Sequence, residues 1–298
     1  MPILKKEYEW SLGAGAVSKD IPLAKRAIAA IILNLDALGN TGGATAANML
    51  TQFGTKIYVK DGGTKITPEW TGAELAEYMA QFFGRPYGTP FQDGTAANDK
   101  MALLSLIIPF GRPYIGVHGS ILPALIDPHV GFKPVNTPYL HIEAPADGST
   151  LDTRHLKATV IYYDSPPKYT KKWTDWASQT VSTTSLTDWT IGDRGLWLEA
   201  FLFATTSYND TLASDAPSIK EIEIERLGKD VLFSGAVPNI LGALIDTTNV
   251  ADDDYLYLTL SQAPFDNFAN CVRLAGETKF RILGGVADAV KAAFSVIS

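Results

Sequence analysis

Residues 57–66 read Ile-Tyr-Val-Lys-Asp-Gly-Gly-Thr-Lys-Ile, and residues 222–231 read Ile-Glu-Ile-Glu-Arg-Leu-Gly-Lys-Asp-Val. In both stretches apolar side chains alternate with polar ones on either side of a glycine, which is typical of a β-hairpin. The second stretch begins 165 residues after the first, and an internal repeat at this distance indicates a duplicated domain rather than a solenoid. We therefore expect two similar domains in tandem.

A short helix is predicted after each hairpin. In the first copy, Thr71 and Glu74 have the spacing of a capping box, so a helix begins there and ends near Phe83. In the second copy, Ser234 or Gly235 caps a helix that ends near Asp246. The apolar positions of the two helices are Leu75, Tyr78, Met79 and Phe82 in the first, and Ile240, Leu241, Leu244 and Ile245 in the second.

Apolar runs rich in β-branched residues predict buried strands at matching places in the two halves. They lie at Ala27–Leu35 and Ala102–Phe110 in the first half, and at Leu196–Thr205 and Tyr255–Gln262 in the second. Many short strands, frequent Gly and Pro turns and only two convincing internal helices predict an all-β fold of antiparallel sandwiches or barrels.

The proline- and lysine-rich segment Asp164–Lys172 is the best candidate for a linker. We expect a first domain in residues 1–165, a linker in 166–172 and a second domain in 173–298. The second domain ends in a predicted helical tail, which docks either on its own domain or on a neighbouring subunit. The tail residues that share one helical face are Val286, Val290, Phe294 and Ile297.

The charge balance limits the classes of partner. The chain has 298 residues and a net charge of −7, and an acidic chain without a long basic run does not bind phosphate backbones through its overall field. Its single cysteine, Cys271, excludes an internal disulfide. The longest apolar run, Ala27–Leu33, is too short to span a bilayer, and the first residues lack the apolar core of a signal peptide. We expect a soluble protein made inside a cell.

Motifs for covalent chemistry are not found in the sequence. The four histidines have no zinc-ligand spacing, and neither a nucleophile elbow nor a phosphate-binding loop is present. We therefore expect no catalytic residues and no cofactor. The most concentrated acidic group is Asp252, Asp253 and Asp254, whose oxygen ligands suit calcium although their spacing does not match an EF-hand. A solvated turn is the competing interpretation of this group.

Two further groups of residues suggest binding surfaces. Lys5 and Lys6, close to Trp10, could contact anionic lipid headgroups, or this end of the chain is simply frayed. A cluster of tryptophans could stack on sugar rings, which supports the alternative of a carbohydrate-binding or glycan-processing protein. Its members are Trp173, Trp176, Trp189 and Trp197, of which Trp197 lies in a predicted buried strand.

The order of strand, glycine hairpin, short helix and buried strand resembles that of the double-jelly-roll major capsid proteins. These build tailless icosahedral viruses with an internal membrane, in the lineage that includes adenovirus. The resemblance is carried by Ile57–Phe82 with Ala102–Phe110, and by Ile222–Ile245 with Tyr255–Gln262. It lies in the order of elements and in the duplication, and it contains no catalytic signature.

The resemblance implies two tandem eight-stranded antiparallel jelly rolls, each with one short helix. It further implies a structural protein of the virion capsid, made in the host cytoplasm, that self-assembles as a pseudo-hexameric homotrimer tiling an icosahedral shell over an internal membrane. The implied partners are neighbouring capsomers and minor capsid or membrane proteins, without direct contact to nucleic acid. Both predicted domains are compact and lack a large inserted tower, which argues against a receptor-binding role. A minor virion protein is a third interpretation.

Overall fold

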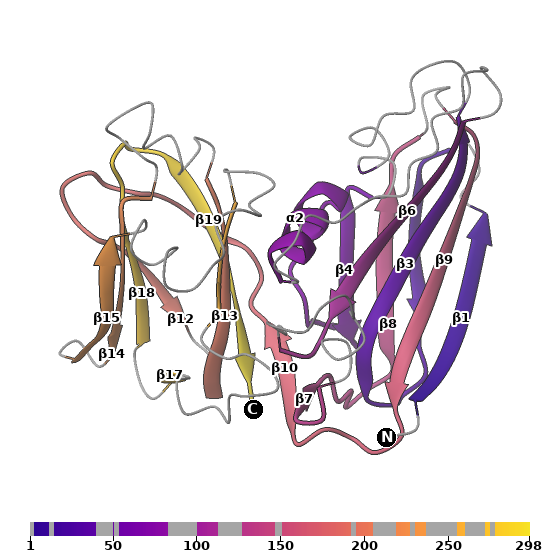
Figure 1. Ribbon diagram of the computed structural model, residues 1–298, viewed down its shortest axis with the longest axis horizontal. Coiled ribbons are helices and arrows are strands. Elements are labelled where there is room, and N and C mark those ends of the chain that lie inside the picture. The colour runs from indigo at the N-terminus through magenta and orange to yellow at the C-terminus, as the bar shows by residue number, and fades with distance from the viewer. Residues whose placement is uncertain are drawn as a thin grey trace, which may run out of the picture. The chain divides into compact units, whose positions relative to one another are not determined.

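The computed structural model of the chain (Figure 1) describes residues 3–11, 15–39, 50, 54–82, 100–112, 127–146, 151–191, 195–204, 219–226, 230–236, 255–259, 272–274 and 278–298. Strands predominate among these residues, as the sequence predicts. The chain divides into two compact units, the first formed mainly by residues up to Thr170 and the second mainly by Lys171–Ser298.

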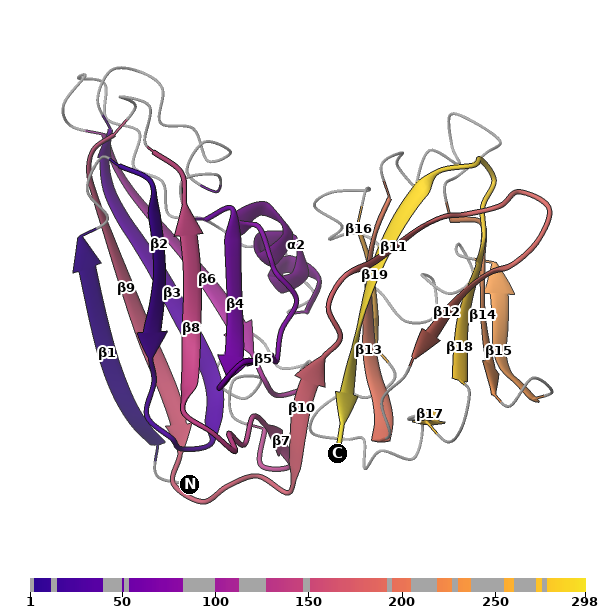
Figure 2. The ribbon, with the colours of Figure 1, turned by 180° about the vertical axis from the view of Figure 1, so that it is seen from behind.

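The first unit consists of two four-stranded antiparallel sheets, seen from behind in Figure 2. The first sheet has the order β1-β9-β3-β6, with the bounds β1 Ile3–Ser11, β9 Leu151–Tyr163, β3 Ile28–Gly39 and β6 Lys100–Pro109. The second sheet has the order β2-β8-β4-β5, with the bounds β2 Val17–Pro22, β8 Pro138–Ala144, β4 Lys56–Asp61 and β5 Thr64–Lys65.

The second unit also has two sheets. One has the order β16-β13-β19-β10, where β16 is Tyr255–Thr259, β13 Gly195–Ala204, β19 Ala289–Ile297 and β10 Tyr169–Trp173. To it are added β11 (Ala177–Thr180), which pairs with β19, and β17 (Val272–Leu274), which pairs with β13. The other sheet has the order β12-β18-β14-β15, where β12 is Thr187–Ile191, β18 Thr278–Leu283, β14 Glu221–Arg226 and β15 Asp230–Ala236.

The two units share one topology. Among the described residues, each unit has eight strands when β10 and β11 are counted as one. This count leaves out β17 and β7 (Val130–Gly131), which pairs with the start of β10. Numbered along the chain, the eight strands have the orders 1-8-3-6 and 2-7-4-5 in both units. This is the strand order of an eight-stranded jelly roll. The two units are called the first and the second jelly roll from here on.

The core of each jelly roll lies between its two sheets, because successive side chains of a strand point to opposite faces. In the first jelly roll, Leu33 on β3 and Val59 on β4 are fully buried, as is Leu140 on β8. In the second, Phe280 and Phe294 meet edge to face at 5.1 Å between ring centroids. The apolar sides of the alternating patterns thus supply the two cores.

The helix predicted in the first copy is confirmed as α2 (Gly72–Phe82). Its capping box is formed, because Thr71 Oγ1 accepts a hydrogen bond from Glu74 N at 3.2 Å and Glu74 Oε2 accepts one from Thr71 N at 2.8 Å. The ring of Tyr78 stacks on that of Trp70, with 5.2 Å between centroids. The helix predicted in the second copy does not begin at Ser234 or Gly235, because both residues lie in strand β15 and pair with β14. The rest of that predicted helix, up to Asp246, lies outside the described residues.

Two predictions near the domain ends are wrong. The C-terminal segment is not a helical tail but strand β19, which lies between β13 and β10 in its sheet. Because both faces of this strand are covered, Ala292–Ile297 are all buried and the apolar run fits a helix and a buried strand equally well. Residues 169–173, most of which we assigned to a linker, form β10.

Candidate functional site

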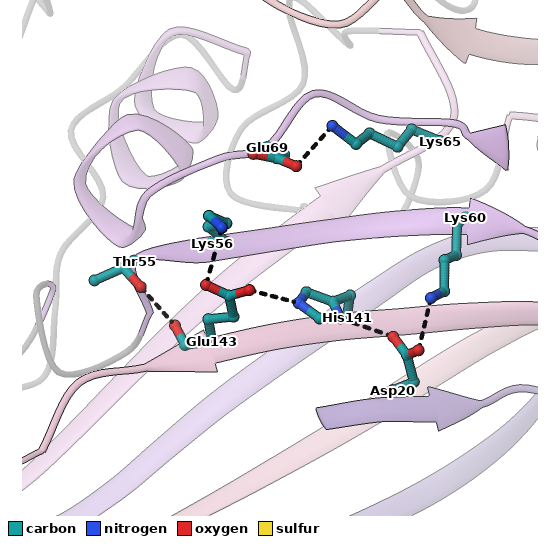
Figure 3. Close-up of polar contacts among 8 residues, drawn as sticks. All are labelled: Asp20, Thr55, Lys56, Lys60, Lys65, Glu69, His141 and Glu143. Atoms are coloured by element: carbon teal, nitrogen blue, oxygen red, sulfur yellow. Dashed lines mark hydrogen bonds and ion pairs between the residues drawn. The ribbon is translucent and has the colours of Figure 1, made fainter. Parts of the chain in front are cut away.

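A ladder of charged side chains crosses the outward face of the second sheet of the first jelly roll (Figure 3). At its centre, His141 on β8 lies between two carboxylates. Its Nδ1 is 2.7 Å from Asp20 Oδ1 on β2, and its Nε2 is 3.3 Å from Glu143 Oε1. The ring stacks on Tyr58 of β4, with 4.5 Å between centroids. Only 11% of the His141 side chain is exposed. We call these residues, with Lys56 and Lys60, the His141 ladder.

Lysines on β4 hold the remaining carboxylate oxygens of the His141 ladder. Lys60 Nζ lies 2.6 Å from Asp20 Oδ2, and Lys56 Nζ lies 3.1 Å from Glu143 Oε2 (Figure 3). The hydrogen bonds from Lys60 and then from His141 lower the pKa of Asp20. Those from Lys56 and then from His141 lower the pKa of Glu143 in the same way. Both carboxylates are therefore ionised down to more acidic pH than free side chains.

The second jelly roll carries a ladder at the same positions. Arg281 on β18 donates from Nε to Asp188 Oδ1 on β12 at 2.8 Å and from Nη1 to Glu223 Oε1 on β14 at 2.9 Å. It also contacts Glu225, and Lys279 Nζ lies 2.9 Å from Asp188 Oδ2. Burial raises the pKa of Asp188, but the hydrogen bonds from Lys279 and Arg281 outweigh it, so that this pKa is lowered. We call these residues the Arg281 ladder.

Strand register makes the two ladders equivalent. In the first jelly roll, Asp20 is the cross-strand partner of His141, which is in turn the partner of Tyr58. In the second, Asp188 is the partner of Arg281, and Arg281 is the partner of Glu223. Tyr58 and Glu223 are also 165 residues apart, the distance that separates the two hairpins. Arginine thus stands in one copy where histidine stands in the other.

A fully buried ion pair lies inside the second jelly roll. Lys171 on β10 and Glu199 on β13 are both 0% exposed, and Nζ lies 2.7 Å from Oε2. Tyr257 on β16 donates a hydrogen bond to Glu199 Oε1 at 3.0 Å. The sequence prediction missed this cluster, because Lys171 lies in the lysine-rich segment taken for a linker. Glu199 could have indicated this cluster in the sequence, because it is a charged residue in the apolar run of β13 and a buried charge requires a partner.

The N-terminal candidates lie on a paired strand. Strand β1 is antiparallel to β9 along its whole length, so the alternative of a frayed end does not hold from Ile3 onward. Lys5 and Lys6 are exposed. The ring of Trp10 stacks on Tyr8 at 5.9 Å between centroids, and Lys19 Nζ lies 5.9 Å from the Trp10 ring centroid. Trp10 is thus engaged within the first jelly roll, and Lys6, although exposed, has its Nζ 4.9 Å from the centroid of the Tyr8 ring.

Among the tryptophans whose side chains are described, none is fully exposed as a platform for sugar rings would be. Trp173 and Trp189 are buried, and Trp189 Nε1 donates to the carbonyl oxygen of Ala177 at 3.2 Å. Trp176 is half-buried, beneath Lys291 Nζ at 4.6 Å and 5.9 Å from the Phe201 ring. These contacts place three of the four tryptophans in or against the second jelly roll, and the side chain of Trp197 lies outside the described set.

The candidate calcium ligands Asp252, Asp253 and Asp254 lie outside the described residues. Within the part of the chain that is described, no three His, Cys, Asp or Glu side chains are grouped so that they could hold a metal ion. No helix in that part is long and apolar enough to cross a membrane.

No family model matches the chain, and no curated protein matches its sequence. Solved structures match along its whole length. The major capsid protein of Sulfolobus turreted icosahedral virus is similar with a TM-score of 0.66 and 11% identity, covering 100% of this chain and 96% of that one. The major capsid protein of bacteriophage PM2 has a TM-score of 0.58 and 11% identity, covering 98% and 97%.

The chain has the double-jelly-roll fold. The strand order within each unit and the full-length similarity lead to this conclusion independently. In the double jelly roll, the His141 and Arg281 ladders occupy equivalent strands of the two barrels, and the Lys171–Glu199 pair belongs to the second barrel alone.

Proposed function

We propose that this chain is a viral major capsid protein that builds a virion shell by self-assembly, with no covalent chemistry of its own. The observation that carries the proposal is the full-length match of a tandem pair of jelly rolls to two major capsid proteins. Two barrels with one strand order present similar surfaces twice in each chain, which suits a tile with near-equivalent edges. We assign the first jelly roll to residues 1–165, and the second to the chain from β10 (Tyr169–Trp173) to residue 298.

The assembly we propose is a homotrimer of six barrels, a pseudo-hexameric tile of an icosahedral shell over an internal membrane. Closed symmetry limits such contacts to a defined particle. Neighbouring capsomers and minor capsid or membrane proteins are the further partners. The net charge of −7 argues against direct binding of the genome. Synthesis in the host cytoplasm precedes incorporation into the virion capsid.

Contact with the membrane is assigned to the N-terminal strand. Lys5 and Lys6 are exposed on β1 and can approach anionic headgroups, each contributing about 1 kcal/mol near such a surface. Trp10 contributes less to membrane contact than a free tryptophan side chain would, because Tyr8 and Lys19 already pack against it. Calcium at Asp252, Asp253 and Asp254 would act as an accessory ligand in assembly.

The experiment is a determination of the solution mass by light scattering, with negative-stain images of the same peak. We expect a particle of three times 32.2 kDa with a hexagonal outline. A strict monomer at high protein concentration, with and without added calcium, would overturn the proposal. A trimer that assembles further only with calcium would support the role of the aspartates.

A further inference from the structure

The two equivalent ladders differ in one chemical property of their central residue. Arg281 stays protonated at every pH at which the protein is folded, because a guanidinium is not deprotonated in proteins. Histidine is the side chain whose charge ordinarily changes between about pH 5 and 8. The central side chain of the first ladder can therefore exist in a charged and a neutral form, whereas that of the second ladder is always charged.

The geometry around His141 requires two protons on its ring. Both ring nitrogens face carboxylate oxygens, at 2.7 Å from Asp20 and 3.3 Å from Glu143. A carboxylate only accepts hydrogen bonds, and a neutral imidazole has a single N–H to donate. Both bonds therefore exist together only in the imidazolium. After loss of a proton, one nitrogen lone pair faces a carboxylate oxygen.

The neighbouring charged groups do not take over this role. Asp20 faces the ring from β2, Glu143 from the same strand and Tyr58 from β4, while Lys60 and Lys56 of β4 contact the outer carboxylate oxygens. Hydrogen bonds from Lys60 and His141 lower the pKa of Asp20, and those from Lys56 and His141 lower that of Glu143. Both carboxylates thus stay ionised, and an ionised carboxylate can only accept hydrogen bonds from the ring.

Strand β2 is the element that depends most on this ladder. It lies at the end of its sheet, and four of its six residues are exposed. Its pairing in the described structure is with β8 alone, from Val17 to Pro22. Few buried side chains hold such an edge strand, so cross-strand polar bonds contribute a large part of its local stability.

We propose that His141 is a pH-responsive contact of the first jelly roll. When its ring is protonated it stabilises the pairing of edge strand β2 with β8, and when the ring is neutral this pairing is weaker. The second jelly roll lacks this response because Arg281 occupies the equivalent position. The stabilisation is present while both ring nitrogens carry protons, and it is lost when the ring is neutral. This inference concerns the fold alone and does not rest on the capsid role.

The test is amide hydrogen exchange of the full-length protein at about pH 5.5 and about pH 8, corrected for the intrinsic pH dependence of exchange. In the wild type we expect the protection of β2 amides to fall about tenfold between the two values, the equivalent of one charged hydrogen bond at a partly exposed site. His141→Arg, which copies the second jelly roll, should abolish this fall. The reciprocal change Arg281→His should create one in β12.

Two outcomes would overturn the proposal. One is equal protection of β2 at both pH values in the wild type. The other is an undiminished fall in His141→Arg, which would assign the response to another group. If either variant fails to fold, the ¹⁵N signals of the wild-type imidazole decide. Both ring nitrogens must be protonated at about pH 5.5, and a neutral ring there refutes the proposal.

Discussion

Lys171 and Glu199 are joined inside the second jelly roll with neither side chain exposed, Nζ lying 2.7 Å from one carboxylate oxygen and 2.9 Å from the other. Tyr257 donates a further hydrogen bond to this carboxylate, and burial together with the adjacent Glu199 raises the pKa of the phenol well above its ordinary value. The phenol therefore keeps its proton and remains a donor. Because burial removes the hydration of both charges, each charge is stabilised chiefly by the opposite charge beside it.

Removal of one member of this pair should be far more harmful than removal of both. In Lys171→Met, the Glu199 carboxylate is left in the core without the opposite charge of Lys171, although Tyr257 still donates to it. We expect the free energy of unfolding to fall by about 3–5 kcal/mol, measured in urea with probes in the second jelly roll. The matched variant Lys171→Met/Glu199→Leu should recover most of this loss. Equal stability of wild type and single variant would show that the pair is solvated.

This pair also shows what sequence patterns could and could not give. The hairpin and capping box were predictable because each is determined by residues a few positions apart, such as Thr71 and Glu74. The pairing of Lys171 with Glu199 depends on β10 and β13 lying in the same sheet, and β19 separates them there. The local composition around Lys171 indicated a solvated segment. Lys171 is buried only because β10 is part of the completed sheet.

The prediction of a C-terminal helix was wrong for a different reason. In β19, helix-favouring alanines such as Ala292 and Ala293 are interspersed with large apolar residues such as Phe294. Local propensity therefore favoured a helix, but pairing with β13 and with β10 and β11 overrides it. In the His141 ladder, His141 and Glu143 share a face because every second side chain of a strand does, whereas Asp20 joins them only through strand register.

The turn of the first hairpin requires glycine at one of its two glycine positions. Gly62 has φ = +60°, and its N–H donates to the Thr137 carbonyl oxygen at 3.1 Å. A side chain in this left-handed conformation costs about 1 kcal/mol, so Gly62→Ala should lower the unfolding free energy of the first jelly roll by about that amount. Gly63→Ala is the matched control, because a Cβ there meets nothing within 4 Å. Equal losses in both variants would show that the left-handed conformation of Gly62 is not the reason why the turn requires glycine.

The Arg281 ladder should contribute stability that is lost in acid. In the folded state, hydrogen bonds from Lys279 and Arg281 outweigh burial and lower the pKa of Asp188 below its ordinary value of 3.8. A carboxylate whose folded-state pKa is lowered stabilises the fold above its unfolded pKa, and this contribution disappears as the pH falls through the lowered folded value. Asp188→Asn should therefore be less stable than the wild type near neutrality, and the difference should shrink below about pH 4.

Urea unfolding of both proteins across this range, followed by probes in the second jelly roll, measures the difference directly. The control is Asp20→Asn at the equivalent position of the first jelly roll, where the pKa is also lowered, by Lys60 and then by His141. It should show the same loss in acid, and in addition a dependence on the charge of His141 at higher pH, because Asp20 is one of the two carboxylates that this ring contacts. A stability difference between Asp188→Asn and wild type that stays constant down to about pH 2 would contradict the lowered pKa of Asp188.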